Sequence, residues 1–162
     1  MNLNKKKIDV IFTDFDGVLT DNKFYLDANG DESVRLNRSD GLAFDYLNKI
    51  KIPIYIISTE KNSIVKTRAK KLKVKCHSGV SDKKKLIIKL CNKNKYSLSK
   101  SIYIGNDVND LSSIKLCNYS FCPKDSNKII KKNSKVVMNV KGGEGVIRYL
   151  VDNYFNDGIG FI

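Results

Sequence analysis

Two aspartates separated by one residue, Asp14 and Asp16, follow the apolar run VIF at residues 10–12, and Gly17 comes directly after them. Aspartate and glycine also begin ordinary turns, so this stretch by itself has a purely structural interpretation. A carboxylate can, however, attack phosphorus, and paired carboxylates bind Mg²⁺ through their oxygens. The chemical interpretation requires polar partners elsewhere in the chain.

Such partners follow later apolar runs. Ser58 and Thr59 end the segment IYIIST, Lys83 lies at the predicted start of a helix in SDKKKL, and Asp107 and Asp110 lie in IYIGNDVND. The carboxyl ends of parallel strands meet at one edge of a sheet, so side chains that are distant in the sequence can share one pocket there. We therefore expect these residues to gather near the two aspartates.

The gathered side chains would suit phosphoryl transfer. Attack by Asp14 would form an aspartyl-phosphate and divide the hydrolysis into two easier steps. Asp16, two residues further along an extended chain, lies on the same side and would protonate the leaving alcohol and then activate water. Ser58 and Lys83 would donate hydrogen bonds to the phosphoryl oxygens, and Mg²⁺ would relieve the repulsion between the carboxylates.

The elements that must position these residues follow from the hydrophobic pattern. Short apolar runs alternate with longer amphipathic segments, which indicates a parallel sheet covered by helices on both faces. The predicted strands span residues 9–13, 53–58, 74–77, 101–104, 119–121 and 135–138, and the predicted helices span 41–49, 61–72, 81–94, 109–116, 126–132 and 144–155. We therefore expect an α/β fold with a Rossmann-like, doubly wound parallel sheet.

One segment departs from this alternation. Residues 20–38 alternate in polarity on both sides of DANGD, an Asn-Gly turn signal, which predicts a β-hairpin inserted after the first strand. The length of 162 residues fits a single domain, 1–162, with no room for a cap domain beyond the hairpin. Mobile ends are expected at 1–6 and 156–162.

Composition narrows the function classes. The chain has 30 Lys and Arg against 17 Asp and Glu, a net charge of +13, but the lysines are scattered without an aromatic stripe, so we expect no specific nucleic-acid binding. Nucleic-acid binding driven by net charge, which falls steeply with salt, is the alternative.

No apolar segment reaches the roughly 20 residues of a membrane span, so we expect no membrane partner and a cytoplasmic protein. Four cysteines without a CxxC pair and one histidine do not favour a zinc site.

These motifs together resemble those of the haloacid dehalogenase superfamily of phosphohydrolases. DFDGV resembles its first motif, Ser58 its second, Lys83 its third and GNDVND its fourth, over about residues 8–154. The resemblance implies an open α/β fold and an enzyme that hydrolyses phosphoric monoesters with Mg²⁺.

The same resemblance assigns roles to the acidic residues. It implies that Asp14 is the nucleophile and Asp16 the general acid and base. It also implies that Asp14, the Asp16 main-chain carbonyl and Asp107 hold Mg²⁺, while Asp110 supports the metal or the lysine.

Three further segments, DGVLTDNKFY, NRSDGLAFDYL and KGGEGVIRYL, resemble the small cap-less branch of that superfamily. This branch includes 3-deoxy-D-manno-octulosonate 8-phosphate phosphatases, the 2-keto-3-deoxynononate and N-acylneuraminate 9-phosphate phosphatases, and a phosphatase-like domain of some acylneuraminate cytidylyltransferases. The likeness implies a phosphorylated sugar-acid substrate and a homotetramer, in which hairpins form a barrel and a neighbouring subunit covers the site.

A departure within the branch favours a nine-carbon sugar. Octulosonate-phosphate phosphatases usually have Gly-Arg after the second-motif hydroxyl, whereas this chain reads STEKN from residue 58. By resemblance to the nononate enzymes, substrate binding is expected from Glu60, Arg68 and Lys71, with Thr59 beside them. A solvated basic helix face is the alternative for Arg68 and Lys71.

The sequence also leaves the exact activity and the role of two loops open. The enzyme could act on the eight-carbon sugar, or the chain could be a structural domain that mainly builds tetramers. Arg38 and Asp40 could reach the pocket, or Asp40 could cap a helix. Gly142, Gly143 and Gly145 could let a loop approach a neighbour's pocket or could begin the last helix.

Overall fold

A six-stranded parallel sheet forms the centre of the computed structural model, which describes residues 3–4 and 6–155. The strand order is β5-β4-β1-β6-β7-β8, with β1 (Val10–Thr13) between β4 (Ile54–Ile57) and β6 (Ser101–Ile104). The outer strands are β5 (Lys75–His77), β7 (Tyr119–Pro123) and β8 (Val136–Met138). The predicted doubly wound parallel sheet is confirmed.

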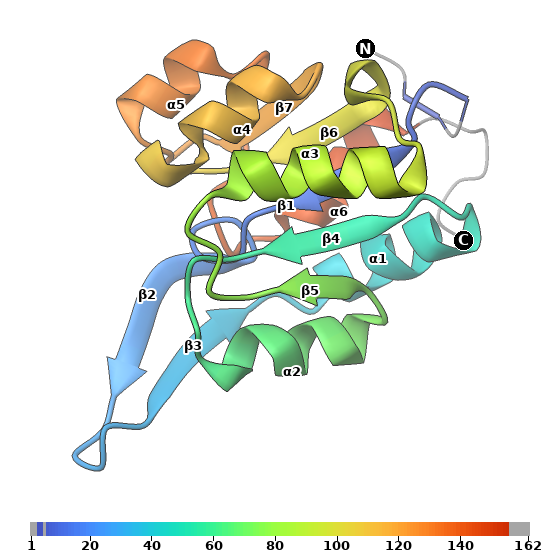
Figure 1. The fold of residues 1–162 in the computed structure, drawn as a ribbon. Coiled ribbons are helices and arrows are strands. Elements are labelled where there is room, and N and C mark those ends of the chain that lie inside the picture. Colours follow the sequence, from blue (N-terminus) through green and yellow to red (C-terminus); the bar gives the residue numbers. More distant parts are fainter. Residues whose placement is uncertain (1–2, 5, 156–162) are drawn as a thin grey trace.

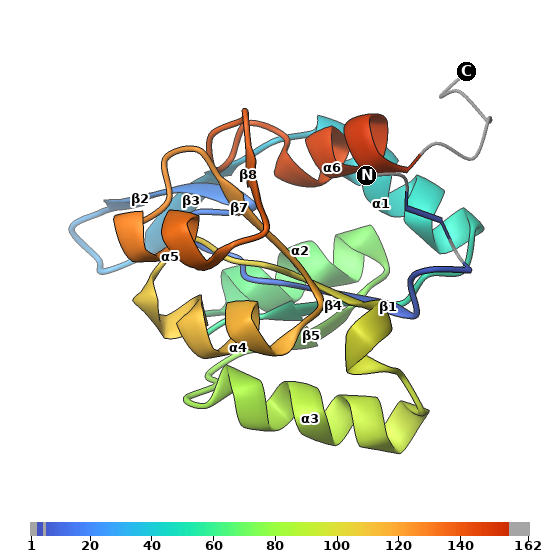
Figure 2. The ribbon, with the colours of Figure 1, turned by 90° about the horizontal axis from the view of Figure 1, so that it is seen from above.

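Helices cover both faces of the sheet (Figure 2). One layer contains α1 (Ser39–Lys49), α2 (Ser63–Leu72) and α6 (Val146–Tyr154), and the other contains α3 (Lys83–Asn94), α4 (Leu111–Leu116) and α5 (Lys128–Asn133). Short 3₁₀ turns, η1 (Leu98–Lys100) and η2 (Val108–Asp110), precede β6 and α4. The predicted helix at 109–116 therefore begins with a tighter turn.

The central strand is buried on both faces. Ile11 packs into the core under α1, α2 and α6, whereas Val10 and Phe12 pack into the core under α3, α4 and α5. This division follows from the alternation of side chains along a strand. It explains why the strand is continuously apolar up to its polar carboxyl end.

The predicted hairpin is also confirmed. β2 (Thr20–Leu26) and β3 (Glu32–Leu36) pair antiparallel as a separate two-stranded sheet. Asp27 Oδ1 accepts hydrogen bonds from the backbone of Asn29 and Asp31, and Gly30 takes a left-handed conformation with φ of 85°. The hairpin projects from the side to which the strands of the main sheet point (Figure 1).

Some sequence predictions concern the ends of the chain. The predicted mobile tail, 156–162, and part of the predicted mobile start lie outside the described residues. Among the residues that are described, no helix is long and apolar enough to cross a bilayer.

Asp40 caps a helix, but not the one that follows it in the sequence. It lies in the first turn of α1 and accepts hydrogen bonds from the backbone N–H groups of Ile147 and Arg148, each at 2.9 Å. These donors belong to the first turn of α6, which the Asp40 carboxyl group thereby satisfies. Asp40 is 1% exposed and does not line the pocket described below.

Burial raises the pKa of Asp40 from 3.8 to about 6, against the lowering effect of its hydrogen bonds to Arg148 and Ile147 and of the Arg68 charge. The folded protein therefore holds this proton more tightly than the unfolded chain. The stability linked to protonated Asp40 is present below about pH 4 and is lost as the pH rises through about 6.

We expect Asp40→Asn to remove this pH dependence, because the amide oxygen keeps the cap but does not ionise. Urea unfolding of both proteins at pH 4.5 and 7.5 measures the effect. The free energy of unfolding of the variant, relative to the parent, should rise by about 2 kcal/mol between the two pH values. A difference that does not change with pH would contradict the titration of Asp40.

Candidate active site

A pocket of about 580 Å³ lies at the carboxyl edge of the sheet. The loop after β1, the loop after β4, the loop after β6 and the hairpin all contribute to its lining: Asp14, Asp16, Asn22, Lys23, Phe24, Glu32, Val34, Thr59, Glu60, Asn62, Asn106, Asp107, Val108 and Asn109. Residues that follow β1, β4 and β6 therefore line one pocket, as the sequence predicted.

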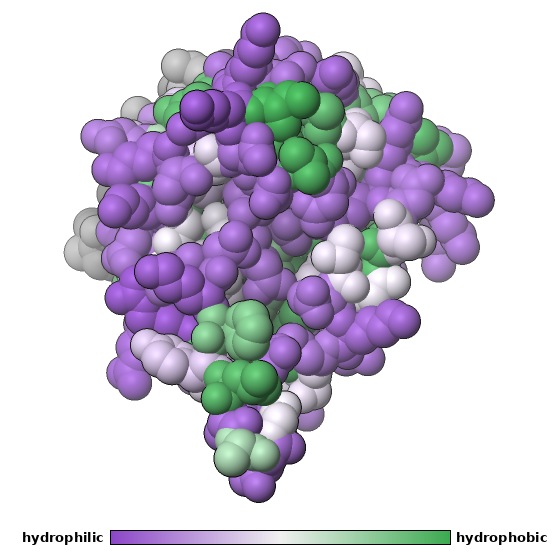
Figure 3. All heavy atoms as spheres, turned by 90° about the vertical axis from the view of Figure 1, so that its left-hand side faces the viewer, coloured by the Kyte–Doolittle hydropathy of each residue, from purple (hydrophilic) through white to green (hydrophobic). Residues whose placement is uncertain are grey.

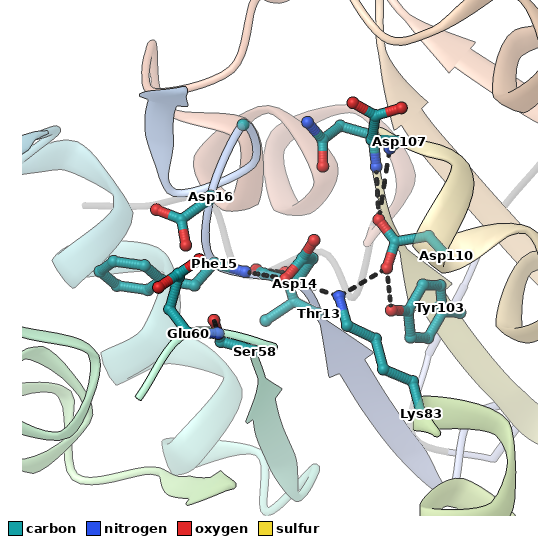
Figure 4. Close-up of polar contacts among 12 residues, drawn as sticks. Thr13, Asp14, Phe15, Asp16, Ser58, Glu60, Lys83, Tyr103, Asp107 and Asp110 are labelled. Atoms are coloured by element: carbon teal, nitrogen blue, oxygen red, sulfur yellow. Dashed lines mark hydrogen bonds and ion pairs between the residues drawn. The ribbon is translucent and has the colours of Figure 1, made fainter. Parts of the chain in front are cut away.

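Lys83 joins the first and fourth motifs at this pocket (Figure 4). Its Nζ lies 2.8 Å from Asp14 Oδ1 and 2.8 Å from Asp110 Oδ1, and all three side chains are buried. Asp82 caps α3 by accepting the backbone N–H of Lys85, which begins the helix at Lys83. Burial lowers the pKa of Lys83, but the two carboxylates outweigh this effect and raise it overall, so the ammonium remains charged.

Asp14 ends the central strand inside this network. Its Oδ1 also accepts the backbone N–H of Phe15 at 2.7 Å, and its main-chain carbonyl accepts the Thr13 hydroxyl at 2.8 Å. Burial raises the pKa of Asp14 well above its usual value, and the Asp110 charge adds to this, while Lys83 opposes both. One carboxylate oxygen is thus fixed toward Lys83.

Asp16 also lines the pocket and is less buried than Asp14. Burial raises its pKa, the Glu60 charge raises it further, and a hydrogen bond from Thr20 opposes the change. The Thr20 hydroxyl oxygen lies 3.5 Å from Asp16 Oδ1 and accepts the backbone N–H of Gly17 at 3.1 Å. A carboxyl group with a raised pKa retains its proton more readily, which suits a general acid.

Asp110 organises the loop after β6. Its Oδ1 accepts hydrogen bonds from Lys83 and from the hydroxyl of Tyr103, and its Oδ2 accepts the backbone N–H of Asn106 at 2.9 Å and of Asp107 at 3.4 Å. The sequence pattern did not indicate Tyr103, because a tyrosine in a buried strand is ordinarily a core residue.

Glycines in the last loop pack against the first motif of the same chain. A Cβ on Gly142 would lie 2.3 Å from the carbonyl oxygen of Gly17, and the N–H of Gly143 donates to Val18 O at 3.0 Å. Gly145 is the N-cap of α6 and has φ of 89°. Within this chain, the loop therefore supports the Asp16–Gly17 turn, and Gly145 begins the last helix.

The predicted substrate-binding residues divide into two pairs. Thr59 and Glu60 line the pocket, but Arg68 and Lys71 do not. Arg68 donates to the carbonyl of Asn37 at 3.0 Å, and Lys71 is exposed. The helix begins only at Ser63, so Glu60 lies before it and does not share its helical face. The roles of these four residues stay predictions.

Ser58 is buried directly after β4, and its hydroxyl accepts the backbone N–H of Glu60 at 3.0 Å. Figure 4 places it on the Asp14 side of Glu60.

The hairpin contributes lining residues that the motifs did not indicate: Asn22, Lys23, Phe24, Glu32 and Val34. Only the position of the hairpin at the strand ends could have suggested them.

The oxygen-rich composition of the pocket fits a hard cation. Asp14, Asp16 and Asp107 all line it, and Mg²⁺ prefers oxygen ligands. In the described part of the chain, no three His, Cys, Asp or Glu side chains form a metal-binding group. The predicted set of Mg²⁺ ligands contains only two carboxylates, those of Asp14 and Asp107, because its third ligand is the main-chain carbonyl of Asp16.

The chain belongs to the haloacid dehalogenase-like hydrolase family, whose sequence profile matches residues 42–150. It is a hydrolase of phosphoric monoesters, as the motifs predicted. The predicted family and fold class are therefore confirmed.

Individual proteins of this family are similar to the chain over most of its length. The chain is 29% identical to the 3-deoxy-D-manno-octulosonate 8-phosphate phosphatase of Haemophilus influenzae, over 94% of this chain and 85% of that protein. A structure of the same enzyme from Moraxella catarrhalis, in complex with magnesium, phosphate and KDO, has a TM-score of 0.86 at 27% identity and covers 90% of this chain and 84% of that one. A protein from Streptomyces avermitilis, described as a hydrolase of this family, has a TM-score of 0.91 at 31% identity, over 95% and 94% of the two chains.

We expect Tyr103→Phe to lower the free energy of unfolding by about 1–2 kcal/mol, because Asp110 loses a buried hydrogen-bond donor. Urea unfolding gives this difference. Tyr119→Phe on the neighbouring strand β7 is the control, since the hydrogen bonds of Asp110 come from other residues. Equal stability of Tyr103→Phe and the parent would show that the tyrosine hydroxyl does not support Asp110.

Proposed function

We propose that this protein is a Mg²⁺-dependent phosphatase of phosphorylated keto-acid sugars that works through an aspartyl-phosphate. The observation that carries this proposal is the buried Lys83 ammonium, which lies 2.8 Å from both Asp110 and Asp14, and Asp14 lines the pocket. A buried cation at that place can hold a phosphoryl oxygen while Asp14 attacks.

In the first step, a carboxylate oxygen of Asp14 bonds to phosphorus and the bond from phosphorus to the sugar oxygen breaks. Asp16 gives its proton to that oxygen, so the sugar leaves as an alcohol. In the second step, water gives a proton to Asp16 and its oxygen attacks phosphorus, which releases phosphate and restores Asp14. Ser58 and Lys83 donate to the phosphoryl oxygens in both steps.

Bound Mg²⁺ would neutralise charge on the phosphoryl oxygens. Its proposed ligands are Asp14, the Asp16 main-chain carbonyl and Asp107. Asp110 acts on the same site through Lys83 and through the backbone of the loop after β6.

The length of the sugar is the finer part of the proposal. We favour a nine-carbon 2-keto-3-deoxynononate or N-acylneuraminate 9-phosphate, because STEKN replaces the Gly-Arg pattern and brings Glu60 into the pocket lining. The names of the curated relatives support the eight-carbon 3-deoxy-D-manno-octulosonate 8-phosphate as the second candidate. Among the described residues that line the pocket, Lys23 is the one with a cationic side chain. Its ammonium could therefore pair with the carboxylate of the sugar.

The test is phosphate release from octulosonate 8-phosphate, nononate 9-phosphate and N-acetylneuraminate 9-phosphate, with and without Mg²⁺. We expect metal-dependent release that falls at least about 10³-fold in Asp14→Asn, because the amide lacks the nucleophilic oxygen charge. The substrate with the largest kcat/KM identifies the sugar length. No release by a folded protein from any of the three would contradict the proposal and favour a structural domain.

We also propose that the chain assembles as a homotetramer through its hairpins. The apolar side chains of β2 are exposed: Phe24 at 58%, Tyr25 at 73% and Leu26 at 62%. Figure 3 shows apolar side chains on the projecting hairpin, next to a largely hydrophilic surface. Burial of these side chains against other copies would remove them from water.

We expect the parent protein to sediment as a tetramer and Leu26→Asp to sediment as smaller species, because a charge on β2 opposes burial of the hairpin. Analytical ultracentrifugation measures both. Ile129→Asp on α5, which replaces another exposed apolar residue, is the matched control and should leave the tetramer intact. A monomeric parent would rule out this assembly without affecting the catalytic proposal.

A further inference from the structure

We propose that Asn22 is a positioning residue for substrate selection and that it acts through Lys23. The bulge that Asn22 forms in β2 holds the Lys23 ammonium in the pocket, where it binds the carboxylate of the sugar acid. The inference rests on the proposed function, because it assigns a recognition device to the keto-acid substrate.

The first observation is the backbone conformation of Asn22. Asn22 has φ of 62° although it lies within β2. Residues in this left-handed region cost free energy unless their surroundings hold them, and they cluster at binding and active sites. The other described residues with a positive φ, glycines apart, all follow the ends of helices: Lys51, Lys73 and Lys95.

The second observation is the register of the hairpin. Thr20 pairs with Leu36, and Phe24 pairs with Val34. Three residues of β2 therefore lie opposite the single residue Arg35 of β3, so β2 bulges between these two pairs. A bulge re-aims the side chains that it contains, and bulges are common beside active sites.

The bulge brings Lys23 to the pocket side of the hairpin. Side chains of a regular strand alternate between its two faces, so Lys23 would share the face of Tyr25 and lie opposite Phe24. Instead, three successive residues, Asn22, Lys23 and Phe24, line the pocket. Tyr25 is not among the lining residues. The interruption of the strand thus adds the lysine to the pocket.

Thr20 joins the bulge to the first motif. Its hydroxyl oxygen accepts the backbone N–H of Asn22 at 3.2 Å and that of Gly17 at 3.1 Å. The same oxygen lies 3.5 Å from Asp16 Oδ1. The bulge is therefore anchored on the turn that carries the proposed general acid.

The carboxylate of Asp21 holds the other side of the bulge. Its Oδ1 accepts the backbone N–H of Lys23 at 3.3 Å, and its Oδ2 lies 3.2 Å from Arg35 Nε. A Cβ on Gly143 would lie 2.5 Å from the backbone nitrogen of Asp21, so the last loop packs directly on this turn. The chain itself fixes the bulge before substrate binds, which lowers the entropic cost of binding.

The ammonium of Lys23 is available to a ligand. Among the described residues it forms no ion pair. Carboxylates repel the carboxylate of a sugar acid, whereas an unpaired ammonium attracts it. The other ionisable groups of the pocket lining are all carboxyl groups: Asp14, Asp16, Glu32, Glu60 and Asp107.

The test uses octulosonate 8-phosphate, nononate 9-phosphate or N-acetylneuraminate 9-phosphate, whichever the parent hydrolyses with the largest kcat/KM, together with its 1-methyl ester. The ester lacks the carboxylate charge, so the ratio of the two kcat/KM values, acid over ester, measures recognition of that charge. We expect Lys23→Gln to lower the ratio about tenfold or more, mainly through a higher KM for the acid, because a charged hydrogen bond is lost. Lys93→Gln, which removes the same charge from an exposed position of α3, is the matched control and should leave the ratio unchanged.

Variants of Asn22 test the positioning role. Asn22→Gly should keep the ratio, because glycine adopts the left-handed conformation readily. Asn22→Val should lower it as Lys23→Gln does, although the lysine is still present, since a β-branched residue is strained at a positive φ. Addition of Lys23→Gln to Asn22→Val should then lower the ratio no further, because both changes remove one interaction. Thermal unfolding confirms that each variant folds.

The outcomes separate this inference from the proposed function. A parent ratio near one, or a ratio that Lys23→Gln leaves unchanged, would overturn the inference while the phosphatase activity stands. A loss in Lys23→Gln without a loss in Asn22→Val would overturn the positioning role of Asn22. A folded parent that releases phosphate from none of the three acids would contradict the proposed function itself.

Discussion

The site depends on the ion pairs that the buried ammonium of Lys83 makes. Two carboxyl groups, Asp14 and Asp110, lie 2.8 Å from it, and burial of a charge without such a partner is costly. Removal of one member of such a buried group leaves an uncompensated charge, which costs more than an exposed ion pair contributes. The carboxylates outnumber the ammonium, so a second cation at the pocket would complete the charge balance.

The topology of the sheet brings these charges together. β1 lies at the centre, between β4 and β6, and all three strands run in the same direction. Asp14, Ser58 and the loop that contains Asp110 follow the carboxyl ends of these strands. Lys83 lies at the start of α3, in the helix layer on one face of the sheet. Each strand interior is apolar because helices cover both faces, and polar residues begin where that cover ends.

The sequence predicted the parts of this arrangement that depend on local patterns. Strand positions followed from apolar runs, the hairpin from DANGD, and the motif residues from their places after the strands. Other features depend on contacts between distant segments. The cap of α6 by Asp40 joins residues more than 100 positions apart. The Asn106 amide lies where a side chain on Gly17 would be, and this close approach requires the β1–β6 pairing. Neither leaves a local signal. The substrate-binding role of Arg68 was predicted by resemblance, but its side chain donates a hydrogen bond to the carbonyl of Asn37, 31 positions away.

The hairpin connects the pocket to the surface of the molecule. Lys23 and Phe24 of β2 line the pocket, and the next two residues, Tyr25 and Leu26, are exposed. Asn62 at the start of α2 donates to Glu32 of β3 at 3.3 Å, so the hairpin is also tied to the loop that presents Glu60. The core thus supplies the proposed phosphoryl-transfer groups, whereas the hairpin forms a wall of the pocket that would contact the proposed sugar substrate. Under the proposed function, changes in the hairpin would therefore alter the choice of substrate while the buried Lys83, Asp14 and Asp110 keep their positions.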